Sequence, residues 1–315
     1  MYYIGVDIGG TGIKVGVVSE NGEIVCKQSA PTQACEGYEV LAKDIANLIE
    51  KTLDEAKISI KDVKSIGMGC PGSIDDKKGI VLYSNNINLN NAPICDEMKK
   101  YYDIPSYIGN DANCAALGEF FALGDESMEN FVAITLGTGV GGGVIINRKL
   151  FTGSNGIAGE LGHMVIELDG EPCTCGRRGC WEAYASATAL VKQTMDMAEK
   201  YPDSIVAQKV KAFGKASGKT SFDAMREGDK AGKEIVDNYI KYVGEGIVNL
   251  INTFQPDVLA IGGGISREGD NLLNPLKDYV EGRTYGYDSV SKNTRITIAK
   301  LGNDAGIIGA AFLGK

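Results

Sequence analysis

A glycine-rich turn between two apolar strands occurs twice in this sequence, and this repeat limits the possible folds more than any other feature. The corresponding hairpins cover residues 4–18 and 132–146. The sequence GNDA also occurs twice, at 109–112 and 302–305, each time between an apolar strand and a helix rich in small residues. Chance reuse of a good helix start is the alternative, but the matched contexts favour a duplicated α/β fold with two domains around a cleft.

Hydrophobic periodicity divides the chain into a small and a large domain. Apolar residues at helical spacing predict helices at 38–57, 111–123, over most of 183–248, near 268–280 and at 304–313. Short apolar runs predict buried strands at 63–68, 106–108, 258–261 and 295–299. We therefore expect a small α/β domain made of residues 1–116 and about 302–315, and a large α/β domain made of residues 117–301.

The overall charge is acidic, with 41 Asp and Glu residues against 32 Lys and Arg residues and a net charge of −9. A chain of this sign without a long basic run is poorly suited to coat a phosphate backbone, so we expect no nucleic-acid partner. A small anion such as a nucleotide can still be held by backbone amides and a few cations. Because the sequence shows no signal-peptide pattern and no apolar run near the roughly 20 residues of a membrane span, we expect a cytoplasmic protein without a membrane partner.

The first glycine turn, DIGGTGIK, has the composition of a phosphate-binding site. Gly9 and Gly10 let successive backbone amides converge on an anion without a Cβ in the way. Thr11 adds a hydroxyl, Lys14 adds a cation, and Asp7 adds an oxygen able to hold hydrated Mg²⁺. An ordinary tight hairpin with a solvated lysine is the alternative, and the enclosed Asp and Gly-Gly-Thr favour phosphate binding over it.

The second glycine turn matches G-x-G-x-x-G from Gly137 to Gly142. A dinucleotide-binding fingerprint requires a helix after the turn, but an apolar strand follows here at 144–146, so that interpretation fails on its context. No GxxxxGK[ST] motif is present either. The two turns instead suggest a paired phosphate clamp, to which this half contributes Gly137, Thr138 and Gly139.

A third glycine turn covers residues 262–266, after a buried strand and before a helix. Gly263 and Gly264 would let the chain pass close to an adenine ring and its ribose. A simple strand-to-helix turn explains the same residues equally well, so both interpretations stay open.

Three thiols and the chain's only histidine have the composition of a metal site. Cys173, Cys175 and Cys180 lie within eight residues, and His163 precedes them by ten. Three thiolates and one imidazole form a closed structural zinc set without an open catalytic position. A disulfide is the alternative for the cysteines, but C-x-C is too short to bridge comfortably and the expected compartment is reducing. Cys26, Cys35, Cys70, Cys95 and Cys114 are scattered, as reduced cysteines of a cytosolic protein are.

Two carboxylates flank the metal-ligand motif. Glu160 precedes His163 by three residues, and Glu182 follows Cys180 by two. A bound metal would fix both on one rigid loop, where paired carboxylates could accept hydrogen bonds from the adjacent hydroxyls of a sugar ring.

Taken together, these motifs resemble the ROK family (repressors, open reading frames, kinases), and within it the glucokinases. The resemblance covers nearly the whole chain, and its segments are DIGGTGIK at 7–14, CPG at 70–72, GND at 109–111, LGTGVGGG at 136–143, GIAGELGH at 156–163, CTCGRRGCWE at 173–182 and GGGIS at 262–266. The block at 136–163 together with the cysteine motif is the most specific part. The family implies an actin-like (ribonuclease H-like) ATPase fold, ATP-dependent phosphoryl transfer to the 6-hydroxyl of glucose, Mg²⁺, and a homodimer.

The resemblance also implies individual roles. Asp111 would be the general base, and Thr11 and Thr138 would face the ATP phosphates. The sugar would contact Gly72, Asn110, Asp111, Glu160, His163 and Glu182. At the start of a helix, Asp111 is expected to stay ionised because the helix dipole favours an anion there. We expect its counterpart in the second repeat, Asp304, to be a helix cap.

Several alternatives stay open within this resemblance. Kinases for N-acetylglucosamine, N-acetylmannosamine, mannose or fructose share the motifs, and polyphosphate is a possible donor in place of ATP. A sugar-responsive regulator without catalysis is the alternative from another functional class. The intact Asp111 and the phosphate-binding turns argue against a regulator.

Overall fold

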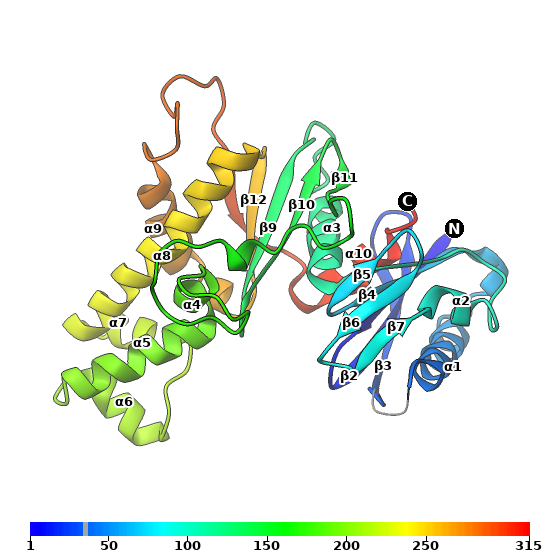
Figure 1. Ribbon diagram of the computed structural model, residues 1–315, viewed down its shortest axis with the longest axis horizontal. Coiled ribbons are helices and arrows are strands. Elements are labelled where there is room, and N and C mark those ends of the chain that lie inside the picture. Colours follow the sequence, from blue (N-terminus) through cyan, green and yellow to red (C-terminus); the bar gives the residue numbers. More distant parts are fainter. Residues whose placement is uncertain (34–36) are drawn as a thin grey trace. The chain divides into compact units, whose positions relative to one another are not determined.

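The computed structural model describes residues 1–33 and 37–315, which form two compact units (Figure 1). The first unit contains residues 1–127, 143–159 and 300–315, and the second contains 128–142 and 160–299. Cys35 lies outside the described residues. The expected small domain ended at 116, within helix α3 (Asp111–Leu123), whereas the first unit includes the whole of that helix.

In the first unit, one sheet contains the strands in the order β3-β2-β1-β4-β8. Their bounds are β1 Tyr2–Ile8, β2 Gly12–Ser19, β3 Ile24–Pro31, β4 Val63–Cys70 and β8 Ser106–Asn110. β1 and β2 form the predicted antiparallel hairpin, and β3 pairs antiparallel with β2. β4 pairs in parallel with β1, and β8 pairs in parallel with β4. The apolar stripe of α1 (Tyr38–Ala56), which includes Leu41 and Ile45, is fully buried in the core of this unit.

The last helix, α10 (Ala305–Ala311), lies against this sheet and against α3 because glycines leave room for it. A Cβ at Gly5 of β1 would lie 1.9 Å from the carbonyl oxygen of Ile307, and one at Gly67 of β4 would lie 1.7 Å from that of Ala310. Such a close approach of two backbones is possible only without side chains. The start of α10 is therefore fixed beside the end of β1, which carries the first glycine turn.

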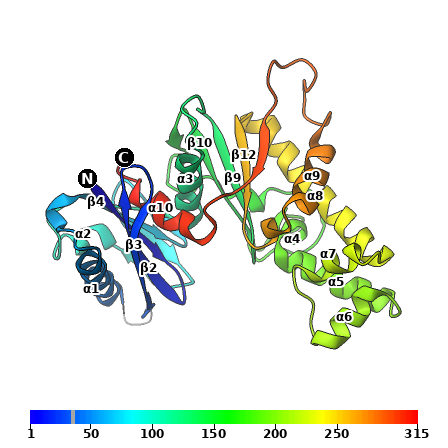
Figure 2. The ribbon, with the colours of Figure 1, turned by 180° about the vertical axis from the view of Figure 1, so that it is seen from behind.

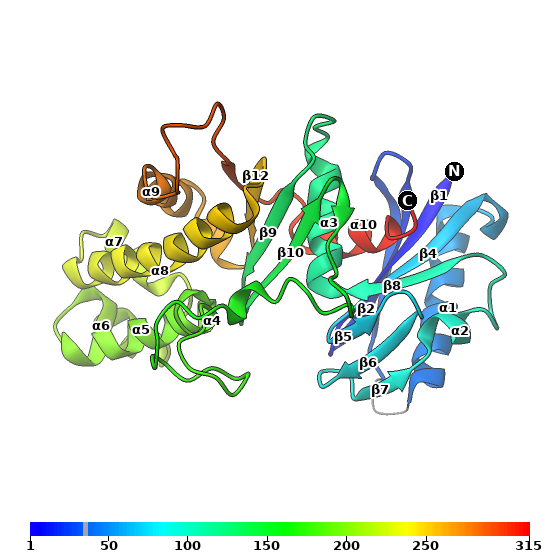
Figure 3. The same cartoon turned by 45° about the horizontal axis from the view of Figure 1, so that its top comes forward.

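A smaller sheet, β5-β6-β7, and a short helix occupy a segment for which the sequence predicted no element (Figure 3). The bounds are β5 Ser73–Asp75, β6 Ile80–Ser84, β7 Leu89–Ala92 and α2 Ile94–Met98. The strands have only three to five residues each, so they contain too few alternations of apolar and polar positions to be recognised.

The other large sheet has the order β11-β10-β9-β12-β13. The bounds are β9 Phe131–Leu136, β10 Val140–Ile146, β11 Lys149–Leu150, β12 Val258–Gly262 and β13 Arg295–Ile298. When the strands of each large sheet are numbered in sequence order, both sheets have the spatial order 3-2-1-4-5. In both sheets, the fourth strand is parallel to the first and the fifth is parallel to the fourth. This shared order confirms the duplication.

Helices make up most of the remaining second unit (Figure 2). Their bounds are α4 Glu182–Ala185, α5 Ala187–Lys200, α6 Ile205–Phe213, α7 Thr220–Arg226, α8 Lys230–Phe254 and α9 Asp270–Val280. α8 is the longest helix of the segment that was predicted to be mostly helical, and its buried residues include Tyr239, Val243 and Ile247. Within residues 1–33 and 37–315, no helix combines the length and apolar character needed to cross a membrane.

Candidate functional site

The first glycine turn connects β1 and β2 in the first unit. Asp7 and Lys14 lie opposite each other in the β1–β2 register, and the Lys14 Nζ is 2.8 Å from Asp7 Oδ2. The N–H of Gly9 donates to the carbonyl of Gly12 at 2.9 Å and closes the turn. Gly10 and Thr11 at the tip are exposed. The turn therefore presents backbone, a hydroxyl and an ion pair to a ligand.

Helix α3 begins at Asp111, as predicted, and Asn110 caps it. The Asn110 Oδ1 accepts hydrogen bonds from the N–H groups of Ala112 at 2.9 Å and Asn113 at 3.2 Å. Its Nδ2 donates to the carbonyl of Gly72 at 3.2 Å. The side chain of Asn110 thus links Gly72 to the first turn of the helix that begins with Asp111.

The half-buried carboxyl of Asp111 titrates above the ordinary range of an aspartate. Removal from water raises its pKa, and the nearby charge of Asp7 adds to the increase, while hydrogen bonding to the N–H of Ala112 opposes it. The position of Asp111 at the start of a helix, from which we expected it to stay ionised, accounts only for the influence that lowers its pKa. A carboxylate with a raised pKa binds a proton more strongly, which suits a general base.

Asp304, the counterpart of Asp111 in the second repeat, does not cap α10, so that prediction was wrong. Its side chain accepts no hydrogen bond from the helix, because both carboxylate oxygens lie 2.8 Å from Lys27 Nζ on β3. The chain before α10 is itself a helical turn at Gly302–Asp304, so Asp304 has helical backbone angles rather than those of a cap.

The second glycine turn connects β9 and β10, and a strand rather than a helix follows it, as predicted. Thr138 is exposed at its tip, and Gly137 and Gly139 are half-buried. The N–H of Val140 donates to Glu182 Oε2 at 3.0 Å. A Cβ at Gly139 would lie 2.1 Å from the same oxygen, so glycine is required where this carboxylate meets the turn.

The predicted metal ligands come together in the second unit. The candidate ligand atoms of His163, Cys173, Cys175 and Cys180 all lie within 4.8 Å of one another. The Cys173 Sγ is 3.6 Å from His163 Nδ1, and the Cys175 Sγ is 3.7 Å from Cys180 Sγ. Tetrahedral zinc with bonds of about 2.0–2.3 Å separates its ligands by about 3.5–3.8 Å, so the donor set fits such an ion.

The metal-ligand cluster is anchored on both sides. Before it, Glu160 is exposed, and its carbonyl accepts the N–H of His163 at 3.1 Å. After it, the fully buried Trp181 donates from Nε1 to the carbonyl of Tyr242 on α8 at 2.7 Å. Glu182, besides accepting from Val140, has its Oε1 3.4 Å from Thr174 Oγ1. The predicted sugar carboxylate Glu182 thus joins the cluster to the second glycine turn.

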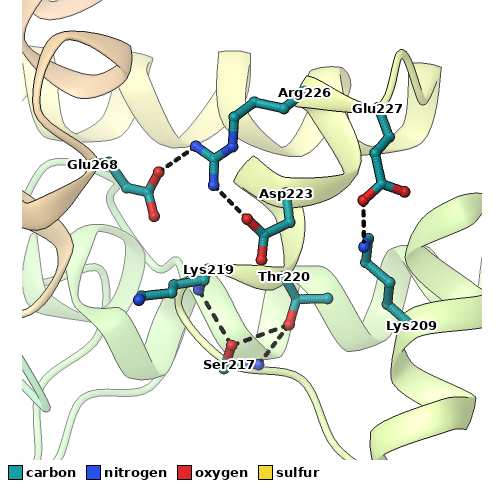
Figure 4. Close-up of polar contacts among 8 residues, drawn as sticks. All are labelled: Lys209, Ser217, Lys219, Thr220, Asp223, Arg226, Glu227 and Glu268. Atoms are coloured by element: carbon teal, nitrogen blue, oxygen red, sulfur yellow. Dashed lines mark hydrogen bonds and ion pairs between the residues drawn. The ribbon is translucent and has the colours of Figure 1, made fainter.

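The third glycine turn is tied to helix α7 by an arginine. Gly263 and Gly264 are exposed between β12 and the short helix η4 (Ile265–Glu268). Arg226 of α7 donates to Glu268 at 2.6 Å and also pairs with Asp223, as Figure 4 shows. The Glu268 side chain is only 7% exposed, and its ion pair with Arg226 offsets the free-energy cost of removing this carboxylate from water.

The predicted site residues therefore form one set in each unit. The first unit holds Asp7, the first turn, Gly72, Asn110 and Asp111. The second unit holds the second and third turns, the metal-ligand cluster, Glu160 and Glu182. Sequence reasoning missed two threonines, Thr32 and Thr188, which hydrogen-bond to the first and second turns. Neither belongs to a recognised motif, so no signal in the sequence would have found them.

Known proteins resemble this chain over nearly its whole length. A family model described as the ROK family matches residues 3–315. A glucokinase from Halalkalibacterium halodurans is 38% identical over 100% of this chain and 95% of that protein. A glucokinase from Thermotoga maritima is 39% identical over 98% of this chain and 96% of that protein. A crystal structure of a ROK family glucokinase from Streptomyces griseus, in complex with glucose and AMPPNP, matches with a TM-score of 0.79 and 34% identity, covering 99% of both chains.

Proposed function

The chain belongs to the ROK family and is an ATP-dependent sugar kinase of the actin-like (ribonuclease H-like) ATPase fold, and we propose that its acceptor is the 6-hydroxyl of glucose. The observation that carries the proposal is the full-length similarity to two glucokinases together with the local arrangement around Asp111. Asn110 caps the helix that begins with Asp111, and partial burial makes the Asp111 carboxylate a stronger base than a solvated aspartate.

Phosphoryl transfer has a loose transition state, so positioning and charge stabilisation dominate catalysis. In our proposal, Asp111 orients the acceptor hydroxyl and takes its proton as the hydroxyl oxygen bonds to the γ-phosphorus of ATP, while the bond from that phosphorus to the β–γ bridging oxygen breaks and ADP leaves. The amides of the two glycine turns, with Thr11 and Thr138, bind the ATP phosphates, and the third turn with Gly263 and Gly264 lies along the adenosine. Asp7 is the residue that would hold Mg²⁺ through water, and the ion would offset the phosphate charge.

Zinc is the proposed occupant of the metal-ligand cluster. Three thiolates and one imidazole leave no open coordination position, so the ion would be structural. It would order a loop that has little apolar surface to bury and that carries Glu160 and Glu182 toward the sugar hydroxyls. His163 would serve both the metal and the sugar.

A sugar panel tests the acceptor. Purified protein with Mg²⁺ and ATP should phosphorylate glucose with a kcat/KM at least tenfold above that for mannose, fructose, N-acetylglucosamine and N-acetylmannosamine. A higher kcat/KM for one of those sugars would replace glucose as the acceptor. Glucose binding without turnover would favour a sugar-responsive regulator. Polyphosphate in place of ATP, assayed in parallel, tests the donor.

A further inference from the structure

A threonine from outside the first glycine turn binds two of its carbonyls. Thr32 directly follows β3, whose last residue Pro31 pairs with Gly12 at the end of the turn. The Thr32 hydroxyl donates to the carbonyl of Gly9 at 2.6 Å. Its backbone N–H donates to the carbonyl of Thr11 at 3.3 Å. Both hydrogen bonds draw carbonyl oxygens of the turn toward β3.

The second glycine turn has a matching arrangement built from unrelated sequence. Thr188, in the first turn of α5, donates its hydroxyl to the carbonyl of Thr138 at 2.7 Å. The N–H of the preceding residue, Ala187, donates to the carbonyl of Gly137 at 2.8 Å. Thus each glycine turn has two carbonyls that accept hydrogen bonds from residues outside the turn, and in each turn one of the donors is a threonine hydroxyl.

Fixing a carbonyl also fixes the N–H of the next residue, because the two groups of a planar trans peptide point in opposite directions. The carbonyls of Gly9, Gly137 and Thr138 share peptides with the N–H groups of Gly10, Thr138 and Gly139. In the part of the chain that the structure describes, these three N–H groups have no hydrogen-bond acceptor. They are therefore directed away from the threonines and available to an anion.

We propose that Thr32 and Thr188 are positioning residues, which hold the two glycine turns with their N–H groups facing the nucleotide phosphates. Neither threonine needs to touch the nucleotide. If the threonine hydroxyl were absent, the peptide that it holds could rotate and present its carbonyl oxygen to the phosphate. The negative phosphate would repel that oxygen. The inference rests on the proposed kinase function and adds to it the residues that preorganise phosphate binding.

The test compares isosteric variants that lack the hydroxyl with variants that keep it. Thr32→Val and Thr188→Val remove the donor, whereas Thr32→Ser and Thr188→Ser retain it. Thr52→Val and Thr253→Val are matched controls, since each also removes a threonine hydroxyl that donates to a carbonyl, at 2.6 and 2.7 Å, but within helices α1 and α8. Titration calorimetry then gives the Kd of AMPPNP with Mg²⁺ and, separately, the Kd of glucose.

Each Val variant at Thr32 or Thr188 should bind AMPPNP about 5- to 30-fold more weakly, as expected for the loss of a positioning hydrogen bond. Glucose affinity should stay within about twofold, and the Ser variants and both controls should bind AMPPNP like the wild type. Unchanged AMPPNP affinity in the Val variants would overturn the inference and leave the proposed function intact. Equal loss of glucose affinity would also overturn it, because it indicates general unfolding. A wild-type protein that binds no AMPPNP would instead contradict the proposed function.

Discussion

Asp111 shows how a single residue's chemistry depends on terms that pull in opposite directions. Its place at the start of α3 gives it the N–H of Ala112 as a hydrogen-bond donor, which stabilises the carboxylate. Removal from water and the charge of Asp7 act against ionisation and raise the pKa of Asp111 above its usual range. The Asp111 carboxyl is therefore harder to ionise than that of a solvated aspartate, and once ionised it is a stronger base, which suits its proposed role.

Asp111→Asn should lower kcat by about 10²–10⁴-fold, because the amide cannot accept the proton of the sugar hydroxyl. Glucose affinity should change little, since Asn retains the shape and one acceptor oxygen. Asp304→Asn is the matched control from the second GNDA segment and should leave kcat unchanged, because Asp304 is paired with Lys27. Steady-state kinetics and calorimetry check both variants, and near-normal turnover in Asp111→Asn would exclude Asp111 as the base.

The same substitution should stabilise the fold at neutral pH. A group whose pKa is raised on folding binds protons more strongly in the native state, so its contribution to stability falls as pH rises through that pKa. Above the raised pKa, folding of the wild type must remove a charged carboxylate from water, which lowers its free energy of unfolding. The neutral Asn side chain of the variant carries no such charge. Below the unfolded value near 3.8, both proteins are neutral at this position. Thermal unfolding should therefore give Asp111→Asn the higher Tm at pH 7, with a difference that shrinks toward pH 4.

The kcat/KM of the wild type should fall as pH drops through the raised pKa of Asp111, because the active form is its carboxylate. The acid limb of the kcat/KM–pH profile, which reports the free enzyme, should therefore lie above the ordinary titration range of aspartate. Circular dichroism at each pH separates this loss from acid unfolding. A kcat/KM that stays constant down to pH 4 in folded protein would show that Asp111 titrates normally or does not serve as the base.

At the scale of elements, the metal-ligand loop is linked to the second glycine turn, because Glu182 accepts a hydrogen bond from the N–H of Val140. Cys175→Ala should therefore abolish stoichiometric zinc, raise the glucose KM by at least tenfold and raise the ATP KM by a smaller factor. Metal analysis and kinetics check these outcomes. The fluorescence of Trp181, the chain's only tryptophan, reports whether the loop has left α8. Unchanged glucose affinity in a zinc-free variant would contradict the proposed role of the loop.

The contact between α7 and η4 makes a second prediction at this scale. Arg226→Gln should destabilise the second unit by about 1 kcal/mol, because it leaves the buried Glu268 side chain without its cation. The substitution should also lower the affinity for ATP more than the affinity for glucose, since η4 directly follows the third glycine turn. Lys209→Met is the control: it breaks the neighbouring Lys209–Glu227 pair, whose Glu227 side chain is 53% exposed, and should cost less. Equal unfolding free energies for both variants would contradict this account.

The sequence predicted elements well where periodicity is long and turn residues are distinctive. The bounds of α3 agree to the residue, and the first glycine turn lies between two antiparallel strands, β1 and β2, as expected. Strands β5, β6 and β7 escaped prediction because each is too short to show alternation. Thr32 and Thr188 escaped because their role depends on a tertiary hydrogen bond, which no local pattern encodes.

For the whole molecule, the duplication explains why two similar glycine turns exist and why the two GNDA segments differ. Both large sheets share one strand order, yet only the first GNDA segment starts a helix with a capping asparagine. In the second, the aspartate is engaged by Lys27 and the helix starts later, at Ala305. In our proposal, the aspartate of the first copy is the base, whereas that of the second copy forms a structural contact with Lys27. The homodimer implied by the family stays a prediction, which sedimentation equilibrium tests.

The proposed reaction can be followed directly through its phosphorus-containing substrates and products. Purified protein, glucose and Mg²⁺-ATP are observed together by ³¹P nuclear magnetic resonance, with Asp111→Asn as a parallel sample. We predict one glucose 6-phosphate for each ADP formed by the wild type, and at least a hundredfold slower formation by the variant. A wild-type sample that forms no glucose 6-phosphate, or that releases inorganic phosphate instead, would contradict the account.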